Sequence, residues 1–250
     1  RADDADAVAA SNAVAAGLVV VASAGNSGHN PYLTGSPGTG KGVINVAAVD
    51  STEKFPAATI ALPGGTSIQA INANGAPLPT TPLKVVVLKD DPATGANEAL
   101  GCSVDAYTKA GIVPGGNQVA VTVRGTCARV ARGVFGQKAG AAAVVMVNNT
   151  ADFPPYEGPI RENPDSGEQY QVTIPLLGVR GVLGAAPTQD GDNLVAAEGF
   201  EVSFSATTMN NPSFRAPASF TSGGPRSGDS GNKPSVAAPG VSIASAGVGT

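Results

Sequence analysis

The chain contains no tryptophan, and aromatic residues make up only 4% of its 250 residues. A hydrophobic core must therefore be built mainly from aliphatic side chains, which the 42% content of hydrophobic residues can supply. Charged residues are also scarce, at 14% with a net charge of −4. Because binding to phosphates needs clustered lysine and arginine, this composition argues against nucleic acid as a partner.

Long apolar runs are missing as well. Runs such as Leu18–Ala22 have the length of a strand, so the sequence predicts neither a transmembrane helix nor a signal peptide, and we expect no membrane insertion. The low lysine content and the abundance of small and polar residues favour a secreted or extracellular protein. The 33 glycines and 20 prolines are scattered along the chain and predict many turns.

Cysteine is limited to Cys102 and Cys127. Two cysteines can form one disulfide or remain reduced in the same domain, and the secreted character favours the disulfide. No cluster of metal-binding residues surrounds them. The sequence therefore indicates no cofactor, although it leaves structural calcium open.

The first fifty residues have the pattern of an α/β fold. Residues 5–16 are predicted to form a helix, because three aspartates suit its first turn and Gly17 suits its C-terminal cap. The apolar run in "LVVVASAGN", Leu18–Asn26, predicts a buried parallel strand, and Gly42–Asp50 predicts a second one. Since the chain starts inside a helical pattern, we expect it to be a piece of a longer protein.

The pattern changes after residue 50 and returns near residue 211. Short strands alternate with proline and glycine turns, which predicts a β-rich α+β domain inserted at residues 51–210. Within it we expect strands at 119–123, 142–147 and 200–206, a helix at about 128–139, and a strand with a short helical turn in "YQVTIPLLGVRGVLGAAP". Residues 1–50 and 211–250 would then belong to one interrupted α/β domain.

The octet "GSPGTGKG", Gly35–Gly42, is similar to the phosphate-binding pattern G-x-x-x-x-G-K-[ST]. Its context does not fit that role. No strand precedes it, Gly42 occupies the hydroxyl position, and a strand-like run follows where a helix is needed. We expect Lys41 to point to solvent, and we predict no nucleotide binding.

Two further segments are similar to protease nucleophile motifs. "GDSGN", Gly228–Asn232, is similar to the trypsin-like motif, and "GTSIQA", Gly65–Ala70, is similar to the subtilisin-like motif "GTSMA". The first lacks suitable partner residues and the second lacks the continuation that opens a helix, so both are interpreted as coincidences. The single histidine, His29, lies in a loop and is expected to be solvated rather than to act as a base.

The segment "VVVASAGNSG", Val19–Gly28, resembles the strand and turn that present the oxyanion-hole asparagine in subtilisin-like serine proteases. The resemblance extends from the preceding helix through "SPGTGKGVINVAAVD" and resumes at "PASFTSGGP" and "KPSVAAPGVSI". This ordered similarity covers about fifty residues at the start of the chain and much of its last forty. One departure is Ser235, where the family usually has aspartate.

This resemblance implies a role for five residues. Asn26 would donate a hydrogen bond to the oxyanion, and the small residues Ser23, Ala24, Gly25 and Gly35 would line a pocket for a large apolar substrate side chain. An asparagine in such a turn can also simply cap it. The family often has a cis bond at the position of Pro37. Subtilases carry Asp, His and Ser in this order, and none of the three is recognisable here, so we expect this chain alone to be inactive.

The inserted segment resembles a protease-associated domain. Its "NQVAVTVRGTCARVARGVFGQKAGAAAVVMVNN" and the later "VTIPLLGV" follow that family's pattern of strand, R-G-x-C, helix ending K-A-G-A, and strand ending in asparagine. Together the two resemblances imply a secreted serine endopeptidase that acts on proteins or peptides, with a non-catalytic insert that gates or recruits substrate. The alternative is a non-catalytic binding module of a surface or scaffold protein with a degenerate protease fold.

Overall fold

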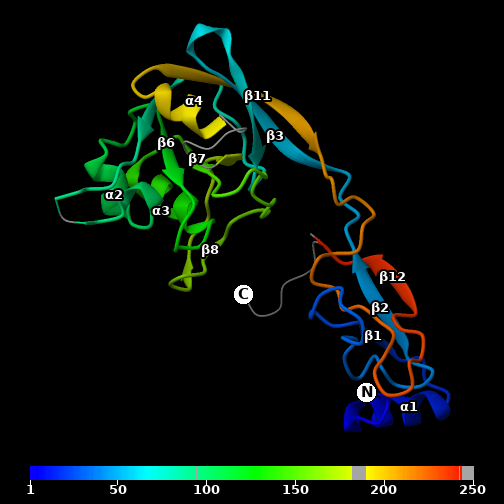
Figure 1. The fold of residues 1–250 in the computed structure, drawn as a ribbon. Coiled ribbons are helices and arrows are strands. Elements are labelled where there is room, and N and C mark those ends of the chain that lie inside the picture. The colour runs from blue at the N-terminus through cyan, green and yellow to red at the C-terminus, as the bar shows by residue number, and fades with distance from the viewer. Residues whose placement is uncertain (94, 182–189, 242, 244–250) are drawn as a thin grey trace. The chain divides into compact units, whose positions relative to one another are not determined.

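The computed structural model describes residues 1–93, 95–181, 190–241 and 243 (Figure 1). The chain divides into two compact units. One consists of residues 1–53 and 211–250 and is called here the sheet unit; the other consists of residues 54–210 and is called the barrel unit. No helix in the described ranges combines the length and apolar character that a membrane crossing requires.

The sheet unit is built around a three-stranded parallel sheet with the order β1-β2-β12. Its elements are the helix α1 (Ala5–Ala15) and the strands β1 (Val21–Ser23), β2 (Ile44–Val49) and β12 (Val236–Pro239). The first and last parts of the chain thus meet in one sheet (Figure 1). Helix and parallel strands agree with the mixed α/β class expected from the sequence.

Helix α1 ends as predicted. Gly17 follows it with a φ of +94° and its N–H donates to the carbonyl of Val14, which is the arrangement that favours glycine after a helix. The helix buries Ala7 completely. A Cβ on Gly40 would lie 2.7 Å from the Ala7 carbonyl oxygen, so the close approach of helix and turn requires glycine at position 40.

The prediction of a buried first strand is wrong. Strand β1 is only three residues long, and the side chains of Val19 and Val21 are 81% and 60% exposed. Within the described residues β1 pairs only with β2, so it lies at an edge of the sheet. The apolar run Leu18–Ala22 therefore remains largely uncovered in this chain.

The barrel unit closes seven strands into a barrel with the order β10-β4-β3-β11-β5-β6-β7. Neighbours from β5 through β6 and β7 to β10 are parallel, and the other pairings are antiparallel. The strands are β3 (Lys54–Ala61), β4 (Ser67–Asn72), β5 (Leu83–Val87), β6 (Gln118–Val123), β7 (Ala143–Val147), β10 (Leu176–Val179) and β11 (Glu201–Asn210). The remaining elements are the 3-10 helices η1 (Pro63–Gly65) and η2 (Glu98–Leu100), the helices α2 (Val104–Lys109), α3 (Ala131–Ala139) and α4 (Asp190–Ala196), and the short strands β8 (Glu162–Asn163) and β9 (Glu168–Gln169).

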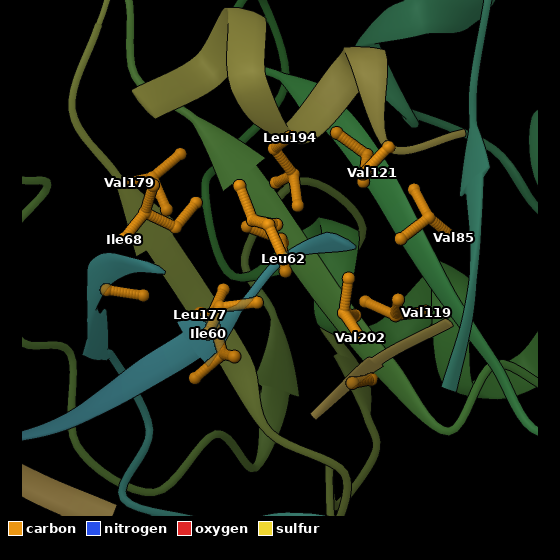
Figure 2. Close-up of a cluster of buried hydrophobic side chains, with 14 of the residues drawn as sticks. Ile60, Leu62, Ile68, Val85, Val119, Val121, Leu177, Val179, Leu194 and Val202 are labelled. Atoms are coloured by element: carbon orange, nitrogen blue, oxygen red, sulfur yellow. The ribbon is translucent and has the colours of Figure 1, made fainter. Parts of the chain in front are cut away.

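The parallel strands of the barrel are buried on both faces. Val85 and Val87 point into the interior cluster, whereas Val86 between them belongs to a second cluster that contains residues of α2 and α3. Figure 2 shows the interior cluster, in which Leu194 of α4 lies near Leu62. Burial on both faces explains why these strands are continuous apolar runs instead of alternating ones.

Most predicted elements of the insert are present. The predicted strands near 119–123, 142–147 and 200–206 correspond to β6, β7 and β11, and the predicted helix begins three residues later, as α3. Helices α2 and α4 were not predicted. The short helical turn expected after "IPLLGV" falls largely on residues 182–189, which lie outside the described residues.

The chain passes between the units at residues 53/54 and 210/211. Strands β3 and β11 pair up to Lys54 and Asn210, and the N–H of Asn211 then donates to the carbonyl of Glu53 at 2.9 Å. The Asn211 side chain donates to a carboxylate oxygen of Asp50 at 2.7 Å. The two crossing segments are thus fastened to each other where they leave the sheet unit.

Candidate functional site

Asn26 lies in the turn that follows β1. The N–H of Ala24 donates to the carbonyl of Val46 on β2 at 2.8 Å, so the chain remains bound to the sheet until just before the turn. Gly25 and Gly28 flank the turn with φ values of +105° and +87°. The Asn26 side chain is exposed and has no hydrogen-bond partner among the residues that the structure describes. Its amide is therefore free to donate to a ligand.

The segment 218–223 lies against this turn. The N–H of Gly28 donates to the Phe220 carbonyl, and the N–H of Gly223 donates to the Gly28 carbonyl, each at 2.9 Å. Ser222 binds the turn on both sides of Asn26, through its N–H to Gly25 and through its Oγ to the N–H of Ser27. No sequence pattern distinguishes Ser222 from the neighbouring small residues.

A pocket of about 430 Å³ opens beside Asn26 at the ends of the parallel strands. Ligand sites of open α/β sheets commonly lie at these carboxyl ends. The lining side chains are small or apolar and none is charged. The lining residues are Val21, Ala22, Ser23, Ala24, Gly25, Asn26, Val46, Ala47, Ala48, Phe220, Thr221, Ala238, Pro239 and Gly240.

Four of the five residues singled out from the sequence line this pocket, namely Ser23, Ala24, Gly25 and Asn26. Gly35 does not line it. Its N–H donates to the carbonyl of Ala24 at 2.9 Å, which places Gly35 directly behind the lining. The peptide bond between Ser36 and Pro37 is cis, as expected.

His29 is not simply solvated, contrary to expectation. Its Nε2 lies 2.7 Å from the carbonyl oxygen of Ala218 and must donate to it, because a carbonyl can only accept. With Nε2 engaged as a donor, that nitrogen cannot accept a proton from a nucleophile. The histidine instead ties its loop to the segment that contains Ser222.

In the trypsin-like motif at Gly228–Asn232, the aspartate Asp229 forms an ion pair with Arg226. Both carboxylate oxygens of Asp229 bind the guanidinium of Arg226, at 2.8 and 2.7 Å, and this pairing holds the pKa of the Asp229 carboxyl well below its usual range. Arg226 also donates to the carbonyl of Thr39 at 2.6 Å. Ser67 of the other motif is the first residue of β4 in the barrel unit. Neither motif presents a serine beside a base.

Lys233 is a buried cation beside the start of β2. Its Nζ donates to the carbonyl of Val43 and lies 3.4 Å from Ser235 Oγ, and burial lowers the pKa of its ammonium group. Ser235 Oγ accepts from the N–H of Asn45 at 3.2 Å. Ser235 thus contributes a hydrogen bond at the position where the resemblance would expect a carboxylate.

The barrel unit contains the predicted disulfide between Cys102 and Cys127. It joins the loop before α2 to the loop before α3. Three lysines of this unit form ion pairs with glutamates, namely Lys89 with Glu198, Lys109 with Glu98 and Lys138 with Glu168. Among the described residues of the whole chain, no group of three or more His, Cys, Asp or Glu side chains is arranged to hold a metal ion.

Comparison with known proteins identifies the core of the barrel unit. The PA domain family matches residues 83–186, so the chain contains a PA domain. The "Minor extracellular protease Vpr" of Bacillus subtilis (strain 168) is 28% identical over 235 residues, or 93% of this chain, which spans only 25% of that relative.

Solved structures of two peptidases are also similar. BSAP, a zinc aminopeptidase from Bacillus subtilis, is 19% identical with a TM-score of 0.38, over 64% of this chain and 32% of that chain. The aminopeptidase from Aneurinibacillus sp. strain AM-1 is 16% identical with a TM-score of 0.38, over 62% of this chain and 35% of that one.

Proposed function

We propose that this chain is part of a secreted subtilisin-like serine endopeptidase, in which the sheet unit contributes to the catalytic domain and the barrel unit is its inserted protease-associated domain. Asn26 is the oxyanion-hole donor of that enzyme. The nucleophile, its histidine base and the aspartate belong to other parts of a longer protein. The 28% identity to an extracellular protease over nearly the whole chain supports this proposal.

The presentation of Asn26 is the observation on which the proposal depends. When a serine attacks a peptide carbonyl, negative charge develops on the oxygen, and a fixed amide donor stabilises that charge by about 3–4 kcal/mol. Asn26 has the required properties, because its amide is exposed and without a partner in the described chain while its backbone is held by the sheet and by the segment 218–223.

The pocket next to Asn26 would receive a substrate side chain. Its volume of about 430 Å³ and its uncharged lining suit a large apolar residue rather than a charged one. Gly35 lies behind the pocket residue Ala24, and as a glycine it places no side chain there. We expect cleavage after large apolar residues.

The exposed valines of the sheet unit favour a larger catalytic domain. Val19 and Val21 have most of their surface in solvent, and Val236 on β12 is also half exposed. Exposed apolar side chains on the edge strands of a sheet are compatible with a surface that another element covers. In the proposed enzyme, further strands and helices of the catalytic domain would cover these side chains.

The barrel unit contributes no catalytic residue to the proposed mechanism. Its cysteines are joined in a disulfide, and several of its charged side chains are engaged in ion pairs or in hydrogen bonds to the backbone. We propose that it binds protein substrates or restricts their access to the site. This role agrees with a domain whose cores are complete without the sheet unit.

Replacing Asn26 in the full-length protein tests the proposal. Asn26→Ala should lower kcat for a peptide substrate by about 10²- to 10³-fold with little change in KM, because the lost hydrogen bond forms only as the transition state is reached. Asn30→Ala, in the same exposed loop, is the matched control and should retain full activity. The isolated chain 1–250 should not react with a fluorophosphonate probe.

The rival function is a non-catalytic binding module. It predicts that the full-length protein has no peptidase activity and no reactive serine. Absence of fluorophosphonate labelling in the full-length protein, or an unchanged kcat for Asn26→Ala, would overturn the enzyme proposal. Labelling of a serine within residues 1–250 would overturn the assignment of the nucleophile to another part of the protein.

A further inference from the structure

We infer that Ser222 is a positioning residue that fixes the orientation of Asn26. It makes one hydrogen bond to the residue before Asn26 and another to the residue after it. This inference deepens the proposed function and rests on it, because the orientation of Asn26 matters for catalysis only if Asn26 binds an oxyanion.

The contact consists of two hydrogen bonds from one buried residue. The N–H of Ser222 donates to the carbonyl oxygen of Gly25 at 2.9 Å, and Ser222 Oγ accepts from the N–H of Ser27 at 3.0 Å. Ser222 is only 1% exposed, whereas Asn26 and Ser27 are exposed. The turn is therefore attached to the protein interior on both sides of the asparagine.

The turn needs such an attachment. Gly25 has a φ of +105°, a conformation that glycine adopts freely and does not itself enforce. The Asn26 side chain has no hydrogen-bond partner of its own in the described chain. Nothing on Asn26 itself would thus hold its amide in one direction, and the flanking peptide groups must determine where it points.

Ser222 also fits closely against Gly25. A Cβ on Gly25 would lie 2.8 Å from Ser222 Oγ, so the hydroxyl occupies the space that any larger residue at position 25 would need. Glycine at position 25 and serine at position 222 are therefore matched. The close contact with Ser222 Oγ explains why position 25 of the turn is a glycine.

The segment that contains Ser222 is itself anchored to the sheet. The N–H of Ala218 donates to the carbonyl of Ala48 at 2.9 Å, and the N–H of Ala48 donates to Thr221 Oγ1 at 3.0 Å. Ala48 lies on β2, the central strand. Ser222 thus connects the turn that contains Asn26 to the central strand β2, in addition to the connection that β1 provides.

An oxyanion donor acts by being in place before charge develops, so its precise orientation affects the transition state more than substrate binding. In the full-length protein, Ser222→Ala should lower kcat by about tenfold and leave KM nearly unchanged, which is less than the about 10²- to 10³-fold loss expected for Asn26→Ala. Ser222→Thr, which retains the hydroxyl, should recover most of this loss. Ser219→Ala, an exposed serine in the same segment, is the control.

A double-mutant cycle separates positioning from a general effect on the fold. In the Asn26→Ala background, Ser222→Ala should change the residual kcat by less than about twofold, because the group through which it acts is gone. A tenfold loss in both backgrounds, or an unchanged kcat for Ser222→Ala alone, would overturn the inference. An unchanged kcat for Asn26→Ala would instead refute the proposed function itself.

Discussion

Because of Tyr107, we expect the stability of the barrel unit to decrease as the pH rises through the alkaline range. Its ring is completely buried, and its hydroxyl donates to the Arg132 carbonyl oxygen at 2.9 Å. Burial raises the pKa of the Tyr107 phenol above its usual range, although the nearby Arg132 guanidinium opposes this shift. Above a pH of about 10 the unfolded chain loses a phenolic proton that the folded chain keeps, so stability must fall as the pH rises.

The expected decrease in the free energy of unfolding follows from the loss of that single proton. Between pH 9 and pH 11 the free energy of unfolding should decrease by about 1.4 kcal/mol more for the wild type than for Tyr107→Phe, which has no phenol to titrate at this position. At pH 7 the same variant should be less stable by about 1 kcal/mol, because the Arg132 carbonyl loses a donor.

Urea unfolding of the chain, followed by far-ultraviolet circular dichroism at several pH values, measures both effects. Tyr32→Phe serves as the control because the Tyr32 side chain is about half exposed. The same measurement on Tyr32→Phe shows how far the removal of a phenol from the sheet unit changes the dependence of stability on pH. If the Tyr107→Phe curve runs parallel to that of the wild type, the buried phenol does not control alkaline stability and the prediction is wrong.

Two further predictions concern the barrel unit. Cys102 and Cys127 are 25 residues apart, so replacing both by serine should lower the free energy of unfolding by about 3.5 kcal/mol in urea titrations, and an unchanged midpoint would contradict this. On α3, Gly136→Ala should destabilise the protein, because the new Cβ would lie 2.3 Å from Val144 Cγ2 and overpacking of about 1–3 kcal/mol exceeds the gain of about 1 kcal/mol in helix propensity. Gly133→Ala, whose Cβ would have 3.3 Å to its nearest neighbour, should be nearly neutral, and equal thermal midpoints for the two variants would show that the close contact is not limiting.

The sequence predicted the elements of the barrel unit better than their arrangement. Strands β6 and β7 were recognisable because each is a short apolar run next to a turn signal. Closure of the barrel depends on β10, which pairs in parallel with β7 and antiparallel with β4. Such pairings join residues far apart in the chain, and no local pattern encodes them.

The candidate site shows the same division between local and distant information. Asn26 and the glycines beside it could be found from one short segment, because a strand, a glycine turn and an asparagine are contiguous in sequence. Ser222 lies 195 residues from Ser27, and it holds the turn through one side-chain and one backbone hydrogen bond. A buried serine among the small residues of "SFTSGGP" has no periodicity that would distinguish it.

The prediction of burial failed for β1, whereas β5, which also contains a run of valines, is buried. Val86 of β5 is covered because β5 has neighbours on both sides and residues of α2 and α3 belong to the same cluster. Val21 of β1 has one neighbouring strand in the described chain and stays exposed. An apolar run thus indicates that burial of the strand would be favourable. Whether the strand is buried depends on which elements pack against it. For β1 this unmet tendency is a physical reason to expect further packing partners, and the catalytic domain proposed here would provide them.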